Sequence, residues 1–95
     1  MENIITKEKL AKYFDVTSRA LEKVRAAMPT AKGERLKADI LLDMAERYFS
    51  DAKHFEAKGD AVNAFACLNY AHGWLDSGAR LGLFDVHDNN LFTAD

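Results

Sequence analysis

The sequence contains a single proline and a single cysteine among its 95 residues. The lone cysteine, Cys67, excludes an internal disulfide bond and any metal site built from pairs of cysteines. The lone proline, Pro29, leaves long stretches of chain free to form helices, because proline is the residue that interrupts them. No apolar run approaches the roughly 18 residues that a membrane span requires, so we expect no membrane-spanning segment.

Neither sign of charge dominates the composition. The 13 Lys and Arg residues against 15 Asp and Glu residues give a net charge of −2, with no strong attraction to nucleic acid or anionic membranes. A hydrophobic fraction of 48% and a charged fraction of 29% are typical of one folded globular domain. Residues 1–6 are too few and too polar for a secretion signal, so we expect a cytoplasmic protein.

Apolar residues recur at intervals of three and four along most of the chain, which is the period of an amphipathic helix. The pattern predicts helices over about residues 6–28, 34–58 and 61–82, followed by a tail, residues 83–95. No alternating pattern of strand length interrupts them. Helices of similar length joined by short turns pack against their neighbours. The sequence therefore predicts an all-α fold, an antiparallel up-down-up three-helix bundle with a short C-terminal tail.

Capping residues mark the ends of these helices. Thr6 and Asp60 precede the first and third helices and have the side chains that accept hydrogen bonds from helix N-termini. Gly59 and Gly82 follow the second and third helices, where a glycine in left-handed geometry ends a helix. Pro29 ends the first, because it disfavours helical geometry at the preceding residue.

The third helix has a wider apolar surface than a helix in a small bundle needs. Three small residues, Ala64, Ala71 and Gly78, lie seven apart along it and predict close packing of helix backbones. Its apolar arc covers about half of the helix surface or more, where a surface helix has a stripe somewhat over 100° wide. We expect the tail, through Leu91 and Phe92, or a second copy of the chain to cover the remainder. The alternative is a frayed tail.

The polar edge of the same helix is the candidate binding site. His72 and Asp76 lie four residues apart and therefore face the same way, which suits a metal ion or an acid–base pair. Two ligands do not complete a zinc site, so we predict no metal, no cofactor and no catalytic residue. A border histidine and an Asp76–Arg80 ion pair is the simpler interpretation. The candidate binding residues are Asn69, His72, Trp74, Asp76 and Arg80.

Aromatic residues and cysteine admit two interpretations each. Tyr48, Tyr70 and Trp74 fit a ligand platform, or amphipathic packing with a polar atom at the rim. Cys67 fits a small buried hydrophobic residue. In both cases packing is the simpler interpretation.

Positive charge is concentrated in the first part of the chain. Residues 1–37 hold nine Lys and Arg against five acidic residues, and residues 38–95 hold four against ten. A basic strip of this kind contacts phosphate in nucleic-acid-binding proteins. Acidic residues interrupt it here, which argues against nucleic acid as the partner. The strip consists of Lys9, Lys12, Arg19, Lys23 and Arg25.

The run from Gly59-Asp60 through Tyr70-Ala-His-Gly-Trp-Leu-Asp76 to residues 80–84, Arg-Leu-Gly-Leu-Phe, resembles a family of short archaeal proteins, domain of unknown function 357. The likeness extends upstream to Tyr48 and Phe55 and so covers most of the chain. It implies a short three-helix bundle from an archaeon. It implies no activity and no catalytic residues, because the family has none assigned.

Three hypotheses about function follow. The first is a non-enzymatic helical module that self-associates or binds another protein through the third helix, because of its wide apolar arc. The second is a small-molecule or metal-binding protein, or an enzyme, using the edge around His72 and Asp76. The third is a nucleic-acid accessory protein using the basic first helix. The composition and spacing favour the first.

Overall fold

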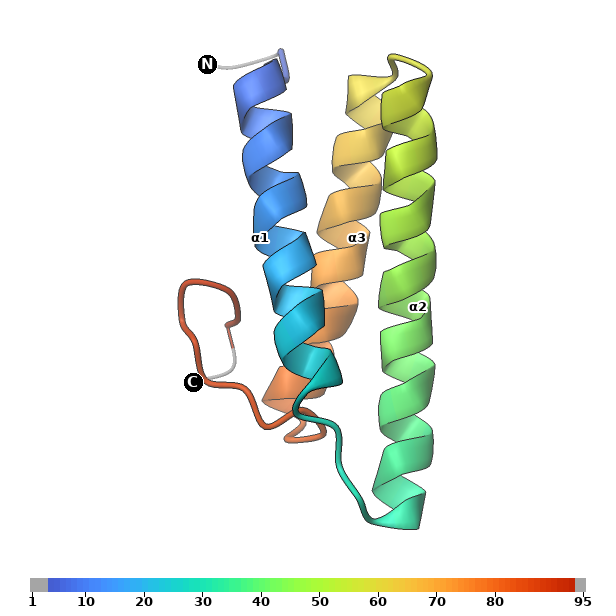
Figure 1. The fold of residues 1–95 in the computed structure, drawn as a ribbon, viewed down its shortest axis with the longest axis vertical. Coiled ribbons are helices and arrows are strands. Elements are labelled where there is room, and N and C mark those ends of the chain that lie inside the picture. The colour runs from blue at the N-terminus through green and yellow to red at the C-terminus, as the bar shows by residue number, and fades with distance from the viewer. Residues whose placement is uncertain (1–3, 94–95) are drawn as a thin grey trace.

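The computed structural model describes residues 4–93, and three helices account for most of that range (Figure 1). Helix α1 spans Lys7–Arg25, α2 spans Lys32–Ala57 and α3 spans Ala61–Arg80. They run up, down and up, with no strand in the described residues. The prediction of an all-α three-helix bundle is confirmed.

The predicted caps begin two of the helices. The side chain of Thr6 accepts a hydrogen bond from the backbone N–H of Lys9 at 3.0 Å, at the start of α1. The side chain of Asp60 accepts one from the backbone N–H of Asn63 at 3.1 Å, at the start of α3. Each bond satisfies one of the N–H groups that a helix N-terminus leaves without an intrahelical partner.

The predicted glycines follow the C-terminal ends of α2 and α3. Gly59 and Gly82 have φ angles of 78° and 76°, in the left-handed region where glycine is favoured. After α3, the backbone N–H of Leu83 donates to the carbonyl oxygen of Gly78 at 2.9 Å, which completes a Schellman motif. The sharp turn directs the chain back toward the bundle.

The helix bounds differ from the predicted ones at several ends. Helix α1 ends at Arg25 instead of residue 28, because the backbone N–H of Ala27 bonds to the carbonyl oxygen of Val24 at 3.0 Å in a tighter turn before Pro29. Helix α2 begins two residues early, at Lys32, and α3 ends two residues early. With 26 residues against 19 and 20, α2 projects beyond the other two helices (Figure 1).

Helices α2 and α3 form the most closely packed pair. Each has a row of small residues seven apart that is completely or almost completely removed from solvent. The antiparallel arrangement puts the two rows level with one another, so the backbones approach closely. The rows are Ala38, Ala45 and Ala52 on α2, and Ala64, Ala71 and Gly78 on α3.

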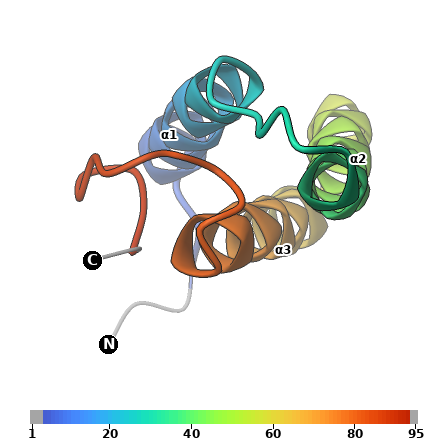
Figure 2. The same ribbon diagram turned by 90° about the horizontal axis from the view of Figure 1, so that it is seen from below.

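Helix α1 contacts α2 and α3 through aromatic pairs at one end of the bundle. The ring of Tyr13 meets that of Phe65 edge to face at a centroid distance of 4.8 Å, and Phe14 meets Phe49 at 5.8 Å. Toward the other end, α1 lies beside the tail (Figure 2). The tail thus takes the place of a fourth layer on the side of α3 away from α2.

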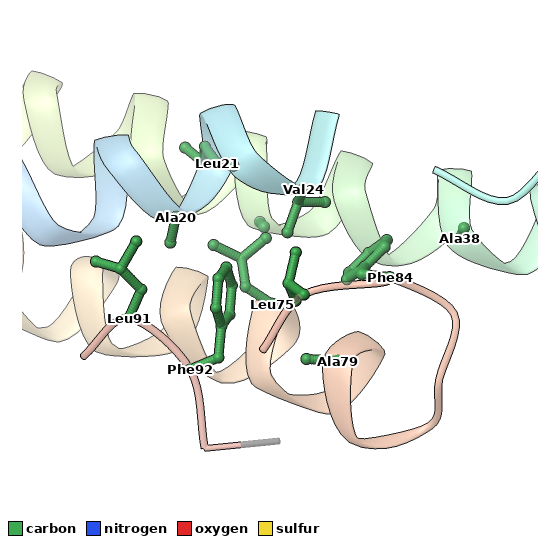
Figure 3. Packing of buried hydrophobic residues seen from close by; sticks show 11 residues of the cluster. Ala20, Leu21, Val24, Ala38, Leu75, Ala79, Phe84, Leu91 and Phe92 are labelled. Carbon is green, nitrogen blue, oxygen red and sulfur yellow. The ribbon is translucent and has the colours of Figure 1, made fainter. Parts of the chain in front are cut away.

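The tail is packed onto the helices and does not fray over its described part. Leu91 and Phe92 are each only 2% exposed, and Phe84 and Val86 are also buried. These side chains join α1, α2 and α3 residues in one apolar cluster that includes Val24 and Leu75. Figure 3 shows Phe84, Leu91 and Phe92 pointing from the tail toward the helices. The tail therefore covers part of the wide apolar arc of α3.

The close contact at Gly78 is made by the tail. A Cβ atom at this position would lie 2.1 Å from a ring carbon of Phe84, and the three nearest atoms all belong to that ring. The prediction of close packing at Gly78 assumed a neighbouring helix. The nearest neighbour is instead an aromatic ring that the turn after Gly82 folds back onto α3.

Thr17 is the one buried polar side chain on the hydrophobic side of α1 within the described range. It is 1% exposed, and its hydroxyl oxygen has no hydrogen-bond partner. A buried unsatisfied hydroxyl costs about 1–3 kcal/mol, and a valine has nearly the same shape. We therefore expect Thr17→Val to raise the free energy of unfolding by about 1 kcal/mol.

Chemical denaturation measures this change. Thr30→Val in the exposed turn after α1 is the control, and we expect it to stay within about 0.5 kcal/mol of the wild type. A Thr17→Val variant less stable than the wild type would show that the hydroxyl has a partner, such as a bound water.

Candidate functional site

The predicted pair on the polar edge of α3 holds the tail. The Nε2 atom of His72 donates a hydrogen bond to the main-chain carbonyl oxygen of Leu91 and lies 3.7 Å from Oδ1 of Asp76. The same Oδ1 accepts a hydrogen bond from the backbone N–H of Thr93 at 3.1 Å. Both side chains are partly buried, at 22% and 25% exposure. Their polar atoms are thus engaged by main-chain groups on either side of Phe92.

Further polar contacts tie the tail to α1. Lys23 Nζ lies 3.0 Å from Oδ2 of Asp88, and the backbone N–H of Asp85 donates to the carbonyl oxygen of Ala27 at 3.3 Å. The hydrogen bond from Lys23 lowers the pKa of the Asp88 carboxyl, with help from the backbone N–H of Asn90. The tail is therefore fixed to both helices by polar bonds around an apolar anchor.

A second group of predicted residues lies elsewhere on α3. Asn69 and Trp74 line an open depression of about 330 Å³ together with Tyr70, Gly73 and Ser77. The depression is shallow and contains no charged side chain. Of the five candidate binding residues, His72 and Asp76 thus lie together at the tail, and Asn69 and Trp74 lie together in the depression. Arg80 is exposed near the end of the helix.

The exposed surface of α3 is unusual in having almost no charge. Exposed residues of α1 and α2 are mostly Lys, Arg, Asp and Glu, as on an ordinary protein surface. On α3 the only exposed charged residue is Arg80, in the last turn. Depletion of charge is a property of the buried centre of protein interfaces. The exposed residues before it are Val62, Asn63, Asn69, Tyr70, Gly73 and Ser77.

Gly73 sits in the middle of this uncharged surface. A Cβ atom there would meet no atom within 4 Å, so no contact within the described chain requires a glycine. Glycine inside a helix costs about 1 kcal/mol relative to alanine. The structure leaves room at Gly73 for the close approach of another molecule.

The apolar surface continues from α3 onto α2. The ring of Tyr70, which is 62% exposed, stacks on the ring of Tyr48 at a centroid distance of 5.2 Å. Residues Met44 and Ile40 precede Tyr48 at intervals of four and so extend the surface along α2. Ile40 and Leu36 are 57% and 64% exposed. The main apolar pattern of α2 does not include these last two residues, although they interrupt its charged side at an interval of four.

These residues lie on the side of the α2–α3 pair that is turned away from α1. Phe49 and Glu46 of α2 contact α1, with Oε2 of Glu46 3.2 Å from Nη2 of Arg25. Tyr48 lies on the other side of α2. No described segment crosses that side of the two helices (Figure 2). We call this surface the α2–α3 face; it comprises Leu36, Ile40, Met44, Tyr48, Asn69, Tyr70, Gly73, Trp74, Ser77 and Leu81.

The basic strip on α1 is largely occupied by contacts within the chain. Arg19 lies 3.2 Å from Asp15, and Lys23 and Arg25 pair with Asp88 and Glu46. The ammonium group of Lys9 lies 5.7 Å from the centre of the Phe65 ring. The strip thus alternates with acidic partners, as its sequence indicates.

Other classes of site find little support between residues 4 and 93. No three His, Cys, Asp or Glu side chains in this range lie close enough to hold a metal ion. None of its helices combines the length and apolar character needed to cross a membrane. Cys67 is only half-buried, where the sequence predicted burial, and burial followed by the charge of Asp51 raises the pKa of its thiol.

Comparison with known proteins identifies the family. A search of the curated proteins and a search of the solved structures found no significant match. The model of the family described as "protein of unknown function (DUF357)" matches residues 12–84. The match includes α2, α3 and most of α1 but ends at Phe84, before Leu91 and Phe92. Because it spans most of the sequence, the chain belongs to the DUF357 family.

Proposed function

We propose that the protein is a non-enzymatic helical interaction module that binds another protein surface through the α2–α3 face. The observation that supports this most directly is the uncharged exposed surface of α3, joined to exposed apolar side chains on α2. The largest apolar patch on a typical monomer is often a functional one, and aromatic residues such as Tyr70 and Trp74 are enriched where proteins bind each other.

The contacts of the tail favour one side of α3 over the other as the binding surface. His72 and Asp76 already bond to main-chain groups of Leu91 and Thr93, and Phe92 lies between these contacts. A ligand at this edge would have to displace them. The α2–α3 face needs no such rearrangement, which favours it over a small-molecule site. An archaeal source and a cytoplasmic location remain expectations from the sequence.

The proposal predicts that a charge in the middle of the α2–α3 face abolishes assembly. Tyr70→Asp would place a carboxylate in the centre of the contact, and burying it without a partner costs several kcal/mol. We expect any complex seen by native mass spectrometry or sedimentation velocity, with itself or another protein, to be lost in this variant.

Ala11→Asp, on the exposed side of α1, is the matched control and should assemble as the wild type does. Circular dichroism confirms that both variants fold. A wild-type chain from its source cells that forms no complex of any kind would contradict the proposal, as would a complex that Tyr70→Asp leaves intact.

A further inference from the structure

We infer that the partner on the α2–α3 face is a second copy of this chain, packed antiparallel so that Lys37 of one protomer faces Asp51 of the other. This inference rests on the proposed function and adds the identity and orientation of the partner. The argument uses the register of α2 on α3, the positions of two charges and the symmetry that relates them.

The stacked rings of Tyr48 and Tyr70 fix the register of the two helices. The helices are antiparallel and each rises about 1.5 Å per residue. Lys37 precedes Tyr48 by eleven residues and is therefore level with Leu81, which follows Tyr70 by eleven. Asp51 follows Tyr48 by three residues and is level with Cys67 in the same way.

The position of Asp51 agrees with this register, because its carboxylate lies near enough to Cys67 on the neighbouring helix to affect the thiol. Burial raises the pKa of the Cys67 thiol most, and the Asp51 carboxylate raises it further. Both Lys37 and Asp51 are exposed. Both lie on the same side of α2 as Tyr48, away from α1, with Lys37 toward one end of the α2–α3 face and Asp51 toward the other.

The two charges are arranged symmetrically about the middle of this face. They are 14 residues apart, or about 21 Å along α2, and the midpoint falls at Met44. On α3 the same level is Trp74, next to Gly73. A two-fold axis that passes through this level, lies in the interface and runs perpendicular to the helices exchanges the ends of the face. It brings Lys37 of each protomer to Asp51 of the other. Such a contact is closed and self-complementary, as in most homodimers.

The other orientation of a second copy is disfavoured by charge. A two-fold axis parallel to the helices would instead put α2 of each protomer on α3 of the other. Lys37 would then face the level of Leu81, and Asp51 the level of Cys67, so neither charge would meet an opposite one. The antiparallel dimer also covers the exposed apolar residues in the right order. Tyr70 and Gly73 lie near the axis, Leu81, which is 71% exposed, lies further out, and the charges form the rim. Apolar centres with polar rims are typical of stable interfaces.

Sedimentation equilibrium of the full chain tests this arrangement by charge exchange. We expect the wild type to dimerise. Asp51→Lys should weaken the dimer roughly tenfold or more, because each dimer contains the opposed charges twice. Lys37→Asp should have a similar effect. The double variant Asp51→Lys with Lys37→Asp restores the opposite charges and should dimerise within about threefold of the wild type.

Ser50→Lys is the matched control, since it introduces a lysine at the exposed position of α2 next to Asp51. It should leave the dimer constant unchanged. All three positions are exposed, so circular dichroism should show wild-type folding in every variant.

A chain that stays monomeric at about 1 mM, where even about −4 kcal/mol of association free energy would show, overturns the inference. So does a dimer that the single exchanges do not weaken or the double exchange does not restore. A monomer that binds a different protein, and loses it on Tyr70→Asp, overturns this inference and leaves the proposed function standing. A chain that neither dimerises nor binds a different protein contradicts the proposed function itself.

Discussion

Gly78→Ala is expected to lower the free energy of unfolding by about 1–3 kcal/mol, although alanine is the better helix former. The added Cβ atom would overlap the ring of Phe84, 2.1 Å away, and that ring is 1% exposed with no free space to enter. Gly78→Leu should lower the free energy of unfolding by nearly as much as the loss of a buried phenylalanine, about 3–5 kcal/mol, because the ring has to leave its site.

The control is the other glycine inside α3. A Cβ atom at Gly73 meets nothing within 4 Å, so Gly73→Ala should raise stability by up to about 1 kcal/mol through helix propensity alone. Urea denaturation, carried out below the concentration at which the chain associates, compares the two variants. Changes of the same sign at both positions would contradict the packing that places Phe84 against Gly78.

Replacing Leu91 and Phe92 together with alanine should cost about 5 kcal/mol or more, the larger part from Phe92. Both side chains are 2% exposed and lie in the same cluster as Val24 and Leu75. Without them the hydrogen bonds from His72 and to Asp76 no longer suffice to hold the segment against its conformational entropy. We expect lower thermal stability and faster hydrogen exchange at the backbone N–H of Thr93.

Asn89→Ala in the same segment is the control, because its exposed side chain should contribute less than about 0.5 kcal/mol. The experiment also measures how far the family-matched region depends on the tail, since the match ends at Phe84. A double variant that melts and exchanges like the wild type would show that the tail is not docked in solution.

Most of the fold could be predicted from local patterns. The caps at Thr6 and Asp60 and the glycines 59 and 82 act within a few residues of their own position, so the sequence displays them directly. The end of α1 was predicted three residues too late. A proline limits where a helix continues, but the tighter turn at Ala27 is set by how the chain crosses to α2.

The candidate site was predicted less completely. The interval of four correctly put His72 and Asp76 on one edge, but their bonds to Leu91 and Thr93 join residues that are 19 and 17 apart in the chain, respectively. No local pattern records such a contact. Leu36 and Ile40 were missed because they lie outside the main apolar stripe of α2, and only exposure in the folded chain distinguishes them.

The sequence by itself determined the helices, their order and their small-residue rows, because helix periodicity, caps and turns depend on neighbouring residues. It also indicated that α3 has more apolar surface than two helices cover. Only the tertiary structure decided what covers that surface. The turn at Gly82 and the burial of Phe84, Leu91 and Phe92 assign the tail to one side of α3 and leave the side with Tyr70 exposed. Which side of α3 the tail covers depends on packing between segments that are distant in the sequence, and therefore on the shapes and burial of their side chains.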